Sequence, residues 1–424
     1  MPPLVAVNSD AKFMSVKPLS TTERVILLVL AATTLVSGLY FARRSGTNPD
    51  AYSNDFNVYY HAAREVIGGR DPYQHSLGDW TPYIYPPLLA ELIVPLAFLP
   101  LPVAAYVWFL IGATSIVAAT WMASGLANRS EETAALEHRP TKSATSRAAI
   151  AACAVIIVLR FVLDTFNLGQ VNALVAGLAV AHVYLYARDR KALSAIALVI
   201  AVSIKLTPAL FLVYHLARLR LKFVLACSAL LVGVTAMSLL PFGQRGTDAF
   251  QTFWNRTVKN EQGYDFAYSG NQSLRGAIAR LTSGANEALP PTASESSKPA
   301  ESTTLLVAMV LLALAVFVAV RARTELAAAA PFFCCLVLLS PLSWKAHYVI
   351  LILPVAYLIS VVNASKSRLI VVALGAALVL FNMTSPRVIG LAAAEWADSH
   401  SLVFCGALVV FFGCVFGTWL TEKR

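Results

Sequence analysis

The chain has 424 residues, of which 58% are apolar and only 13% charged, and its mean hydropathy is +0.66. This composition excludes a soluble globular protein, because it leaves too little polar surface to cover so much apolar area, and it indicates a polytopic membrane protein. The formal net charge of +10 would suit nucleic-acid binding. However, Lys and Arg concentrate in short loops between apolar runs, as the positive-inside rule expects, so nucleic acid is not an expected partner.

The apolar runs predict an all-α protein. A membrane-crossing helix needs about 20 mainly apolar residues, and fewer inside a bundle. After a polar tail, 1–21, the first run lacks a small-residue cleavage site and is expected to be a retained anchor. The strong candidates for crossings are 22–42, 102–126, 148–165, 170–187, 221–241, 303–320, 326–340, 346–363, 368–385 and 400–420.

Two segments break this regular pattern. The apolar stretch 192–217 is interrupted by Lys205-Leu206-Thr207-Pro208, which predicts two short helices that meet at a polar tip. The apolar segment 86–99 follows two prolines, and treating it as a crossing would place the later basic loops on both sides of the membrane. As a helix at the outer surface, it leaves about twelve crossings and puts both termini and all five basic loops in the cytoplasm: 128–147, 188–191, 218–222, 321–323 and 364–368.

This topology divides the chain into a cytoplasmic tail, a transmembrane core over 22–241 with an outer loop at 43–84, an extracytoplasmic loop at 242–301, and C-terminal helices over 302–424. Within the last loop, 284–302 is rich in Ser, Ala, Pro, Glu and Thr and is predicted to be a flexible linker. Five polar segments then lie on the outer face of a cell (plasma) membrane protein, which suggests one cavity: 43–84, 167–172, the tip at Lys205, 242–301 and 340–347.

Asp55 is the first candidate residue in the chain. It precedes Phe56, Tyr59, Tyr60 and Ala63, which share one helical face, so it either caps a short amphipathic helix or acts as a general base beside the lipid boundary. For a base, a nearby cation and the lipid surface would set the pKa.

Three basic residues are candidates for an anion site. Lys205 ends an apolar helix, where an ammonium either meets an anion or snorkels to water. Trp344 and His347 lie one turn apart at the outer end of a predicted crossing. They are either an interfacial aromatic-belt residue beside a solvated histidine, or His347 binds phosphate together with Lys205 and Arg275.

Four amides complete the candidate site: Gln170, Asn172, Asn271 and Gln272. Each could cap a helix or hold a loop, and each could equally hydrogen-bond sugar hydroxyls or phosphate. The six cysteines lie in apolar runs without metal-site spacing. The sequence has no P-loop, dinucleotide fingerprint or HExxH motif, so no cofactor or metal is expected, although a metal at Asp55 stays open.

Six motifs in this sequence resemble those of glycosyltransferase family 87, the polyprenyl-phosphate-mannose-dependent α-(1→2)-mannosyltransferase-like proteins of the GT-C fold. The resemblance covers about residues 20–385. It rests on six ordered motifs: Asp55-Phe56-x-Val58-Tyr59-Tyr60-x-Ala62, Tyr85-Pro86-Pro87-Leu88, Gly169-Gln170-x-Asn172, Lys205-x-x-Pro208, Asn271-Gln272-Ser273-Leu274 and Ser340-Pro341-x-Ser343-Trp344-x-x-His347.

This resemblance implies an integral-membrane hexosyltransferase with an extracytoplasmic active site. A polyprenyl-phosphate-sugar would be the donor, a glycolipid or glycan the acceptor, and the reaction would invert the anomeric carbon. It implies that Asp55 is the catalytic base and that Lys205, Arg275 and His347 face the donor phosphate. The amides and Trp344 would contact sugar or donor, and membrane lipids would surround the chain. A lipid-linked sugar flippase or transporter is the alternative, and a membrane scaffold a weaker one.

Overall fold

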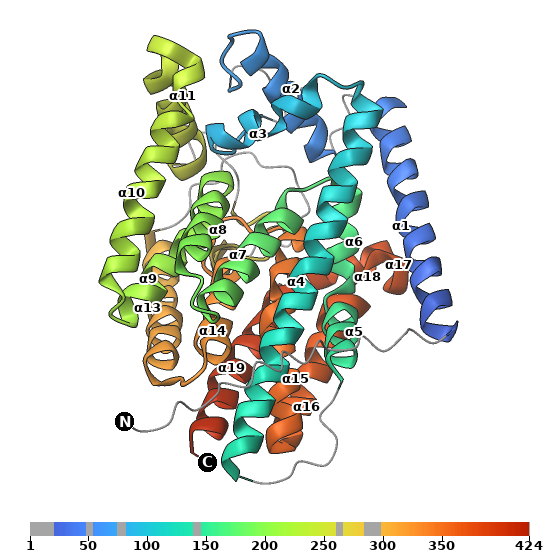
Figure 1. The fold of residues 1–424 in the computed structure, drawn as a ribbon, viewed down its shortest axis with the longest axis vertical. Coiled ribbons are helices and arrows are strands. Elements are labelled where there is room, and N and C mark those ends of the chain that lie inside the picture. Colours follow the sequence, from blue (N-terminus) through green and yellow to red (C-terminus); the bar gives the residue numbers. More distant parts are fainter. Residues whose placement is uncertain are drawn as a thin grey trace, which may run out of the picture.

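The computed structural model describes residues 21–47, 54–73, 82–138, 146–259, 266–283 and 298–423, and every regular element in these ranges is a helix (Figure 1). In chain order the helices are α1 Thr21–Thr47, α2 Asp55–Ile67, α3 Pro87–Ala97, α4 Leu101–His138, α5 Arg147–Ile157, α6 Leu159–Leu168, α7 Asn172–Tyr186, α8 Lys191–Ile204, η1 Thr207–Ala209, α9 Leu210–Ala217, α10 Leu221–Met237, η2 Leu240–Arg245, α11 Gly246–Phe253, η3 Trp254–Val258, α12 Leu274–Ser283, α13 Lys298–Arg321, α14 Glu325–Leu338, η4 Lys345–Leu351, α15 Ile352–Ser365, α16 Arg368–Leu378, η5 Val379–Met383, α17 Pro386–Ile389, α18 Leu391–Ser399 and α19 Leu402–Glu422.

Several of these helices can cross a bilayer. Four in the described ranges are long and apolar enough alone: Leu101–Asn128, Ala300–Arg321, Lys345–Ser365 and Leu402–Glu422. The pair α5 and α6 makes a fifth if its 65° bend is accepted within one span, and seven apolar helices are shorter. These findings fit the predicted all-α polytopic membrane protein. The count of about twelve crossings stays a prediction.

The interrupted stretch 192–217 is confirmed as two short helices with a polar break. Helix α8 ends at Ile204, Lys205 has extended backbone angles (φ −151°, ψ 127°), and η1 with α9 follows. The predicted crossing at 148–165 is instead bent, because α5 ends before Val158 and α6 begins after it. Residues 298–302, expected in the flexible linker, begin α13, and residues 284–297 lie outside the described ranges.

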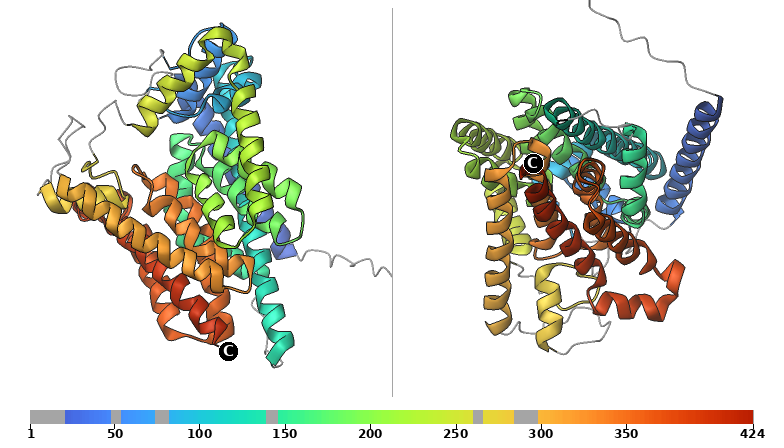
Figure 2. Two further views of the ribbon diagram at one scale, coloured as in Figure 1. Left: turned by 90° about the vertical axis from the view of Figure 1, so that its left-hand side faces the viewer. Right: turned by 90° about the horizontal axis from the view of Figure 1, so that it is seen from below.

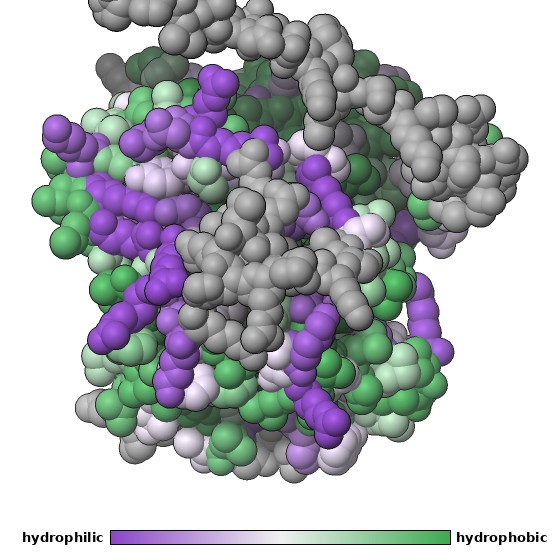
Figure 3. Space-filling view, turned by 60° about the horizontal axis from the view of Figure 1, so that its bottom comes forward, coloured by the Kyte–Doolittle hydropathy of each residue, from purple (hydrophilic) through white to green (hydrophobic). Residues whose placement is uncertain are grey.

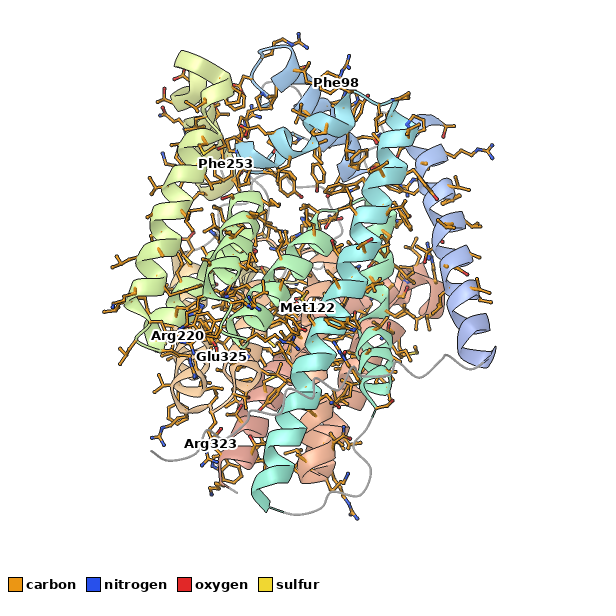
Figure 4. All side chains as sticks on the ribbon, viewed as in Figure 1. Phe98, Met122, Arg220, Phe253, Arg323 and Glu325 are labelled. Atoms are coloured by element: carbon orange, nitrogen blue, oxygen red, sulfur yellow. The ribbon has the colours of Figure 1, made fainter. Side chains whose placement is uncertain are left out.

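Helices α2, α3 and α11 form a layer at one end of the helix bundle, which we call the cap (Figures 1 and 2). Helix α3 has 11 residues and is about 17 Å long, too short for a hydrocarbon core about 30 Å thick. Its buried face packs on α2. Phe253, at the end of α11, also points toward this layer and lies 6.4 Å, centroid to centroid, from Tyr73 (Figure 4). The outer-surface placement of 86–99 is consistent with this short helix.

The buried residues form two hydrophobic cores. The larger core joins α4 to α9 with α13 to α16 and α19, and α15 is its most enclosed crossing helix. The smaller core joins the cap with the adjacent ends of α1, α4 and α7, and Phe56, Tyr59 and Trp108 are buried in it. The first turn of α2 therefore lies where the cap meets the bundle.

Hydrophilic residues gather at the opposite end of the bundle, which Figure 3 shows with that end turned toward the viewer. There Arg220 pairs with Glu325, and the two side chains point toward each other in Figure 4. Arg323 Nε lies 3.1 Å from a carboxylate oxygen of Glu422 near the end of the chain. Several of the basic loops named above thus lie at the end away from the cap.

Candidate active site

Asp55 is the first residue of α2, and its side chain points to a neighbouring turn instead of capping its own helix. The preceding residue, Asn54, occupies the cap position with extended backbone angles and makes no side-chain cap bond. Its amide donates to Ser45 Oγ over 2.6 Å. The Asp55 carboxylate accepts a hydrogen bond from the Gln170 side chain and lies within electrostatic range of Lys205. The base and the cation expected from the sequence therefore lie close together.

The turn between α6 and α7 brings Gln170 to this position. Gly169 ends α6 in the left-handed region, at φ +64°, where a side chain is disfavoured. An added Cβ would lie 2.7 Å from Phe41 Cζ and 3.0 Å from Phe56 Cβ, so the turn packs tightly against α1 and α2. Trp108 Nε1 donates to the Gly169 carbonyl oxygen over 2.8 Å and fixes the same turn from α4.

A row of hydrogen-bonded side chains connects Asp55 to Lys205. The Gln170 side-chain oxygen accepts from the Asn172 amide, and Asn172 Oδ1 accepts from Lys205 Nζ over 2.7 Å. Both amides are buried, whereas Asp55 and Lys205 are half-buried. Neither amide caps a helix in this arrangement: α7 begins without a side-chain cap bond. We call Asp55, Gln170, Asn172 and Lys205 the polar row.

His347 lies beside the end of the polar row. Its ring is within electrostatic range of Lys205 and hydrogen-bonds the backbone of Leu342. The helix that carries it, η4, packs on α6 and α7, and Thr165 Oγ1 donates to the Ala346 carbonyl oxygen over 3.0 Å. Segments more than 100 residues apart thus place two basic side chains next to each other.

Burial raises the pKa of the Asp55 carboxyl to about 6, and the nearby Lys205 charge and the Gln170 hydrogen bond oppose that rise. Desolvation disfavours the charged form of a carboxyl group, whereas a cation or a donated hydrogen bond favours it. A carboxylate with a pKa near neutrality is well matched to accept a proton from an alcohol in a transition state.

Sequence reasoning did not include two tyrosines near the site: Tyr59, within electrostatic range of Asp55, and Tyr85, which contacts Tyr59. Tyr59, one turn further along α2, shares a hydrogen bond of 3.0 Å with the hydroxyl of Tyr85, and its oxygen also accepts from the Val171 backbone over 3.4 Å. The signal was present, because both tyrosines belong to motifs quoted above. Their hydroxyls were overlooked because Tyr59 also fits the apolar face of α2.

The amides of Asn271 and Gln272 are occupied by the protein backbone. Asn271 Nδ2 donates to the carbonyl oxygens of Phe266 and Pro341, each over 3.1 Å, and its oxygen accepts from Ser343 N over 3.0 Å. Gln272 Nε2 donates to the Asp398 carbonyl oxygen over 2.8 Å. Both side chains are buried. Asn271 holds the 340–347 segment, whereas Gln272 holds the end of α18 and the start of α19. Contact with sugar or donor stays a prediction for both.

Arg275 and Trp344 have partners outside the polar row. The Arg275 guanidinium lies 3.5 Å from the ring centroid of Phe266, and its Nη2 lies 3.2 Å from Glu301 Oε1. Trp344 meets Tyr268 edge-on, with ring centroids 5.5 Å apart. Within the described residues, neither side chain contacts Asp55 or Lys205. Their donor roles also stay predictions.

The sequence of this chain matches a family of known proteins. The profile of glycosyltransferase family 87 matches residues 83–341. A polyprenol-phosphate-mannose-dependent alpha-(1-2)-phosphatidylinositol mannoside mannosyltransferase of Mycolicibacterium smegmatis is 31% identical over 70% of this chain and 68% of its own length. The protein with the same description from Mycobacterium tuberculosis is 28% identical over 56% of each chain.

A third relative, a polyprenol-phosphate-mannose-dependent alpha-(1-2)-phosphatidylinositol pentamannoside mannosyltransferase of Mycobacterium tuberculosis, is 27% identical over 62% of this chain and 57% of its own length. The chain spans just over half the length of the second and third relatives. The family profile, in contrast, covers more than half of this chain and includes the polar row from Gln170 to Lys205. The chain therefore belongs to glycosyltransferase family 87 and is a sugar-transferring enzyme.

Proposed function

We propose that this protein transfers mannose from a polyprenyl-phosphate-mannose donor to a hydroxyl group of a phosphatidylinositol-mannoside-type glycolipid on the extracytoplasmic side of the membrane. The polar row beside His347 is the observation that carries this proposal. It joins one carboxylate to two basic groups through two buried amides. The names of the relatives support the choice of donor and acceptor.

In the proposed reaction the Asp55 carboxylate accepts the proton of the acceptor hydroxyl while the oxygen attacks the anomeric carbon. The bond from that carbon to the phosphate oxygen breaks, and polyprenyl phosphate leaves with the electron pair. Lys205 and His347 stabilise the charge that develops on the departing phosphate. A single displacement of this kind inverts the configuration at the anomeric carbon.

The donor is an activated sugar, so the protein need not spend a nucleotide to drive the transfer. Its tasks are to orient the acceptor and to stabilise the leaving group. The two buried amides of the polar row link Asp55 to Lys205 through hydrogen bonds and so fix the positions of both side chains. Tyr59 lies within electrostatic range of the carboxylate and is hydrogen-bonded to Tyr85, and this pair would position the acceptor hydroxyl toward Asp55.

A transfer assay tests this proposal. The purified chain is incubated with radiolabelled polyprenyl-phosphate-mannose and a phosphatidylinositol mannoside, and Asp55→Asn is compared with the wild-type chain. The amide keeps an oxygen that accepts from Gln170 but cannot take up a proton. We expect transfer to fall by roughly two to four orders of magnitude with little change in thermal stability.

The outcomes separate the parts of the proposal. Transfer by the wild-type chain only from polyprenyl-phosphate-glucose would overturn the choice of sugar. Transfer only to acceptors without a phosphatidylinositol group would overturn the choice of acceptor. A folded Asp55→Asn protein that works at close to the wild-type rate would remove Asp55 from the mechanism, and retention at the anomeric carbon would exclude the single displacement.

A further inference from the structure

A large apolar groove lies at the end of the bundle away from the cap. It is formed by α13, α16 and α19, which lie in the lower half of Figure 1, and its volume is about 990 Å³. This volume is at the upper end of the range of about 300–1,000 Å³ found for small-molecule sites. The groove plays no part in the proposed transfer, because the polar row lies where the bundle meets the cap.

The groove has an apolar wall and a charged mouth. The wall along α19 extends from Leu408 to Lys423, about 22 Å of helix, which exceeds half of a hydrocarbon core about 30 Å thick. Ile370 is fully buried at its base, and aromatic side chains such as Phe412 and Phe416 line it. A long alkyl chain would therefore meet carbon atoms along the entire groove.

The mouth carries a net positive charge. Arg321, Glu422 and Lys423 line it, but the Glu422 carboxylate is paired with Arg323. Among the residues that the structure describes, no carboxylate lies within salt-bridge distance of Arg321 or Lys423. Each cation instead lies over an aromatic ring of the groove: Arg321 is 5.3 Å from the centroid of Phe317, and Lys423 is 3.9 Å from that of Trp419. Two cations are thus held at the entrance without an anionic partner.

We propose that this groove binds an anionic phospholipid of the adjacent leaflet, with an acyl chain along α19 and the phosphate between Arg321 and Lys423. The acyl chain of a zwitterionic lipid would contact the same wall, but the cationic group of its headgroup would lie near the two basic side chains and be repelled by them. The match of charge at the mouth and of apolar length along the wall favours a lipid with a net negative headgroup. This site serves the stability or placement of the protein in the bilayer and is separate from the donor site.

Native mass spectrometry of the full-length chain in detergent tests the proposal. Phosphatidylglycerol and phosphatidylcholine with identical acyl chains are titrated separately, and the dissociation constants of the first bound lipid are compared. We expect phosphatidylglycerol to bind roughly 10- to 30-fold more tightly, and we expect Arg321→Gln/Lys423→Gln to abolish that preference.

A matched control removes two cations from the same end of the molecule but outside the groove. Arg188 and Arg190 are exposed, and Arg188 also lies over an aromatic ring, 4.0 Å from the centroid of Tyr184. Arg188→Gln/Arg190→Gln should therefore keep the phosphatidylglycerol preference within about twofold of the wild-type value. A third variant, Ala373→Phe, places a ring in the groove and should weaken binding of both lipids. Gel filtration and thermal midpoints confirm that each variant is folded.

Four results would overturn the proposal. The first is equal affinity of the wild-type chain for the two lipids, and the second is an equal loss of preference in the two charge variants. The third is unchanged lipid binding by folded Ala373→Phe. The fourth is displacement of phosphatidylglycerol by an equimolar amount of polyprenyl phosphate, which would assign the groove to that lipid.

Discussion

At the scale of single residues, the ionisation of Asp55 gives the proposed reaction a pH dependence. Burial raises the pKa of this carboxyl to about 6, and only the carboxylate can accept a proton. Below pH 6 the group is increasingly protonated, so kcat/KM should fall about tenfold per pH unit. Burial lowers the pKa of Lys205 to about 7, against the attraction of the Asp55 charge, so kcat/KM should fall again above pH 7 as the ammonium that faces the phosphate is lost. The donor is a phosphodiester, which has no second ionisation in this range, so titration of the donor does not contribute to the pH dependence of kcat/KM.

A pH–rate profile between pH 4.5 and 8.5 measures this dependence, and thermal midpoints over the same range show where the enzyme stays folded. A profile that is flat between pH 5 and 7 in the folded protein would exclude Asp55 as a base with this pKa.

Lys205 is the second residue with a directly testable role. Lys205→Met keeps the apolar stem but removes the ammonium that donates to Asn172 and lies beside His347. Loss of one charge-assisted contact should raise the KM for the donor by about 10- to 100-fold while the protein stays folded.

The matched control for Lys205 is Lys191→Met. Lys191 is exposed at the start of α8, and its Nζ lies 3.0 Å from Asp189 Oδ1. Donor kinetics should not change in this variant. If Lys205→Met behaves like Lys191→Met, the ammonium of Lys205 only reaches toward water, and the donor phosphate is bound elsewhere.

At the scale of elements, the turn between α6 and α7 decides the geometry of the polar row. Gly169→Ala would place a methyl group against Phe41 and Phe56 in a backbone conformation that disfavours it. We expect the variant to lose about 1–3 kcal/mol of unfolding free energy and to lose activity, because the turn must shift and carry Gln170 with it.

Gly233→Ala is the control at this scale. Gly233 lies inside α10, is exposed, and an added Cβ there would meet no atom within 4 Å. The unfolding free energy of Gly233→Ala should stay the same or rise by up to about 1 kcal/mol, because alanine favours a helix more than glycine does. Thermal unfolding in one detergent compares both variants, and equal stability of the two would show that the α6–α7 turn tolerates a side chain.

At the scale of the whole molecule, the chain is polarised between its two ends. The basic residues Arg220 and Arg323 lie toward one end and the polar row lies near the other, which agrees with a cytoplasmic and an extracytoplasmic face. A cysteine at Ser53 should therefore react with a membrane-impermeant thiol reagent in intact cells, whereas one at Ser143 should react only after the cells are opened. Both positions lie outside the described residues; Ser53 comes shortly before α2 and Ser143 comes between α4 and α5 in the sequence.

The labelling of the unsubstituted chain is subtracted, since its six cysteines are all free and Cys153 is exposed in α5. Labelling at position 143 but not at position 53 in intact cells would show that the orientation is the reverse of the proposed one and that the proposed active site faces the cytoplasm.

The membrane class, the positions of most helices and the break at Lys205 to Pro208 can be predicted from the sequence alone. These features are local: apolar length sets a crossing helix, and proline removes a backbone donor within a few residues. The sequence also identified Asp55, Gln170, Asn172, Lys205 and His347 as polar groups at the ends of apolar segments. Side chains of this kind are costly in lipid, so their positions stand out without a structure.

Which of these groups contact one another depends on how distant helices pack. Gln170 and Asn172 could have capped a helix, but the tight turn at Gly169 and its packing against α1 and α2 place them between Asp55 and Lys205. Asn271 has the same side chain as Asn172, yet the backbone of the 340–347 segment occupies its amide. An amide bonds whichever partner the packing of distant helices places within about 3 Å, and that choice depends on the whole bundle and not on the local sequence.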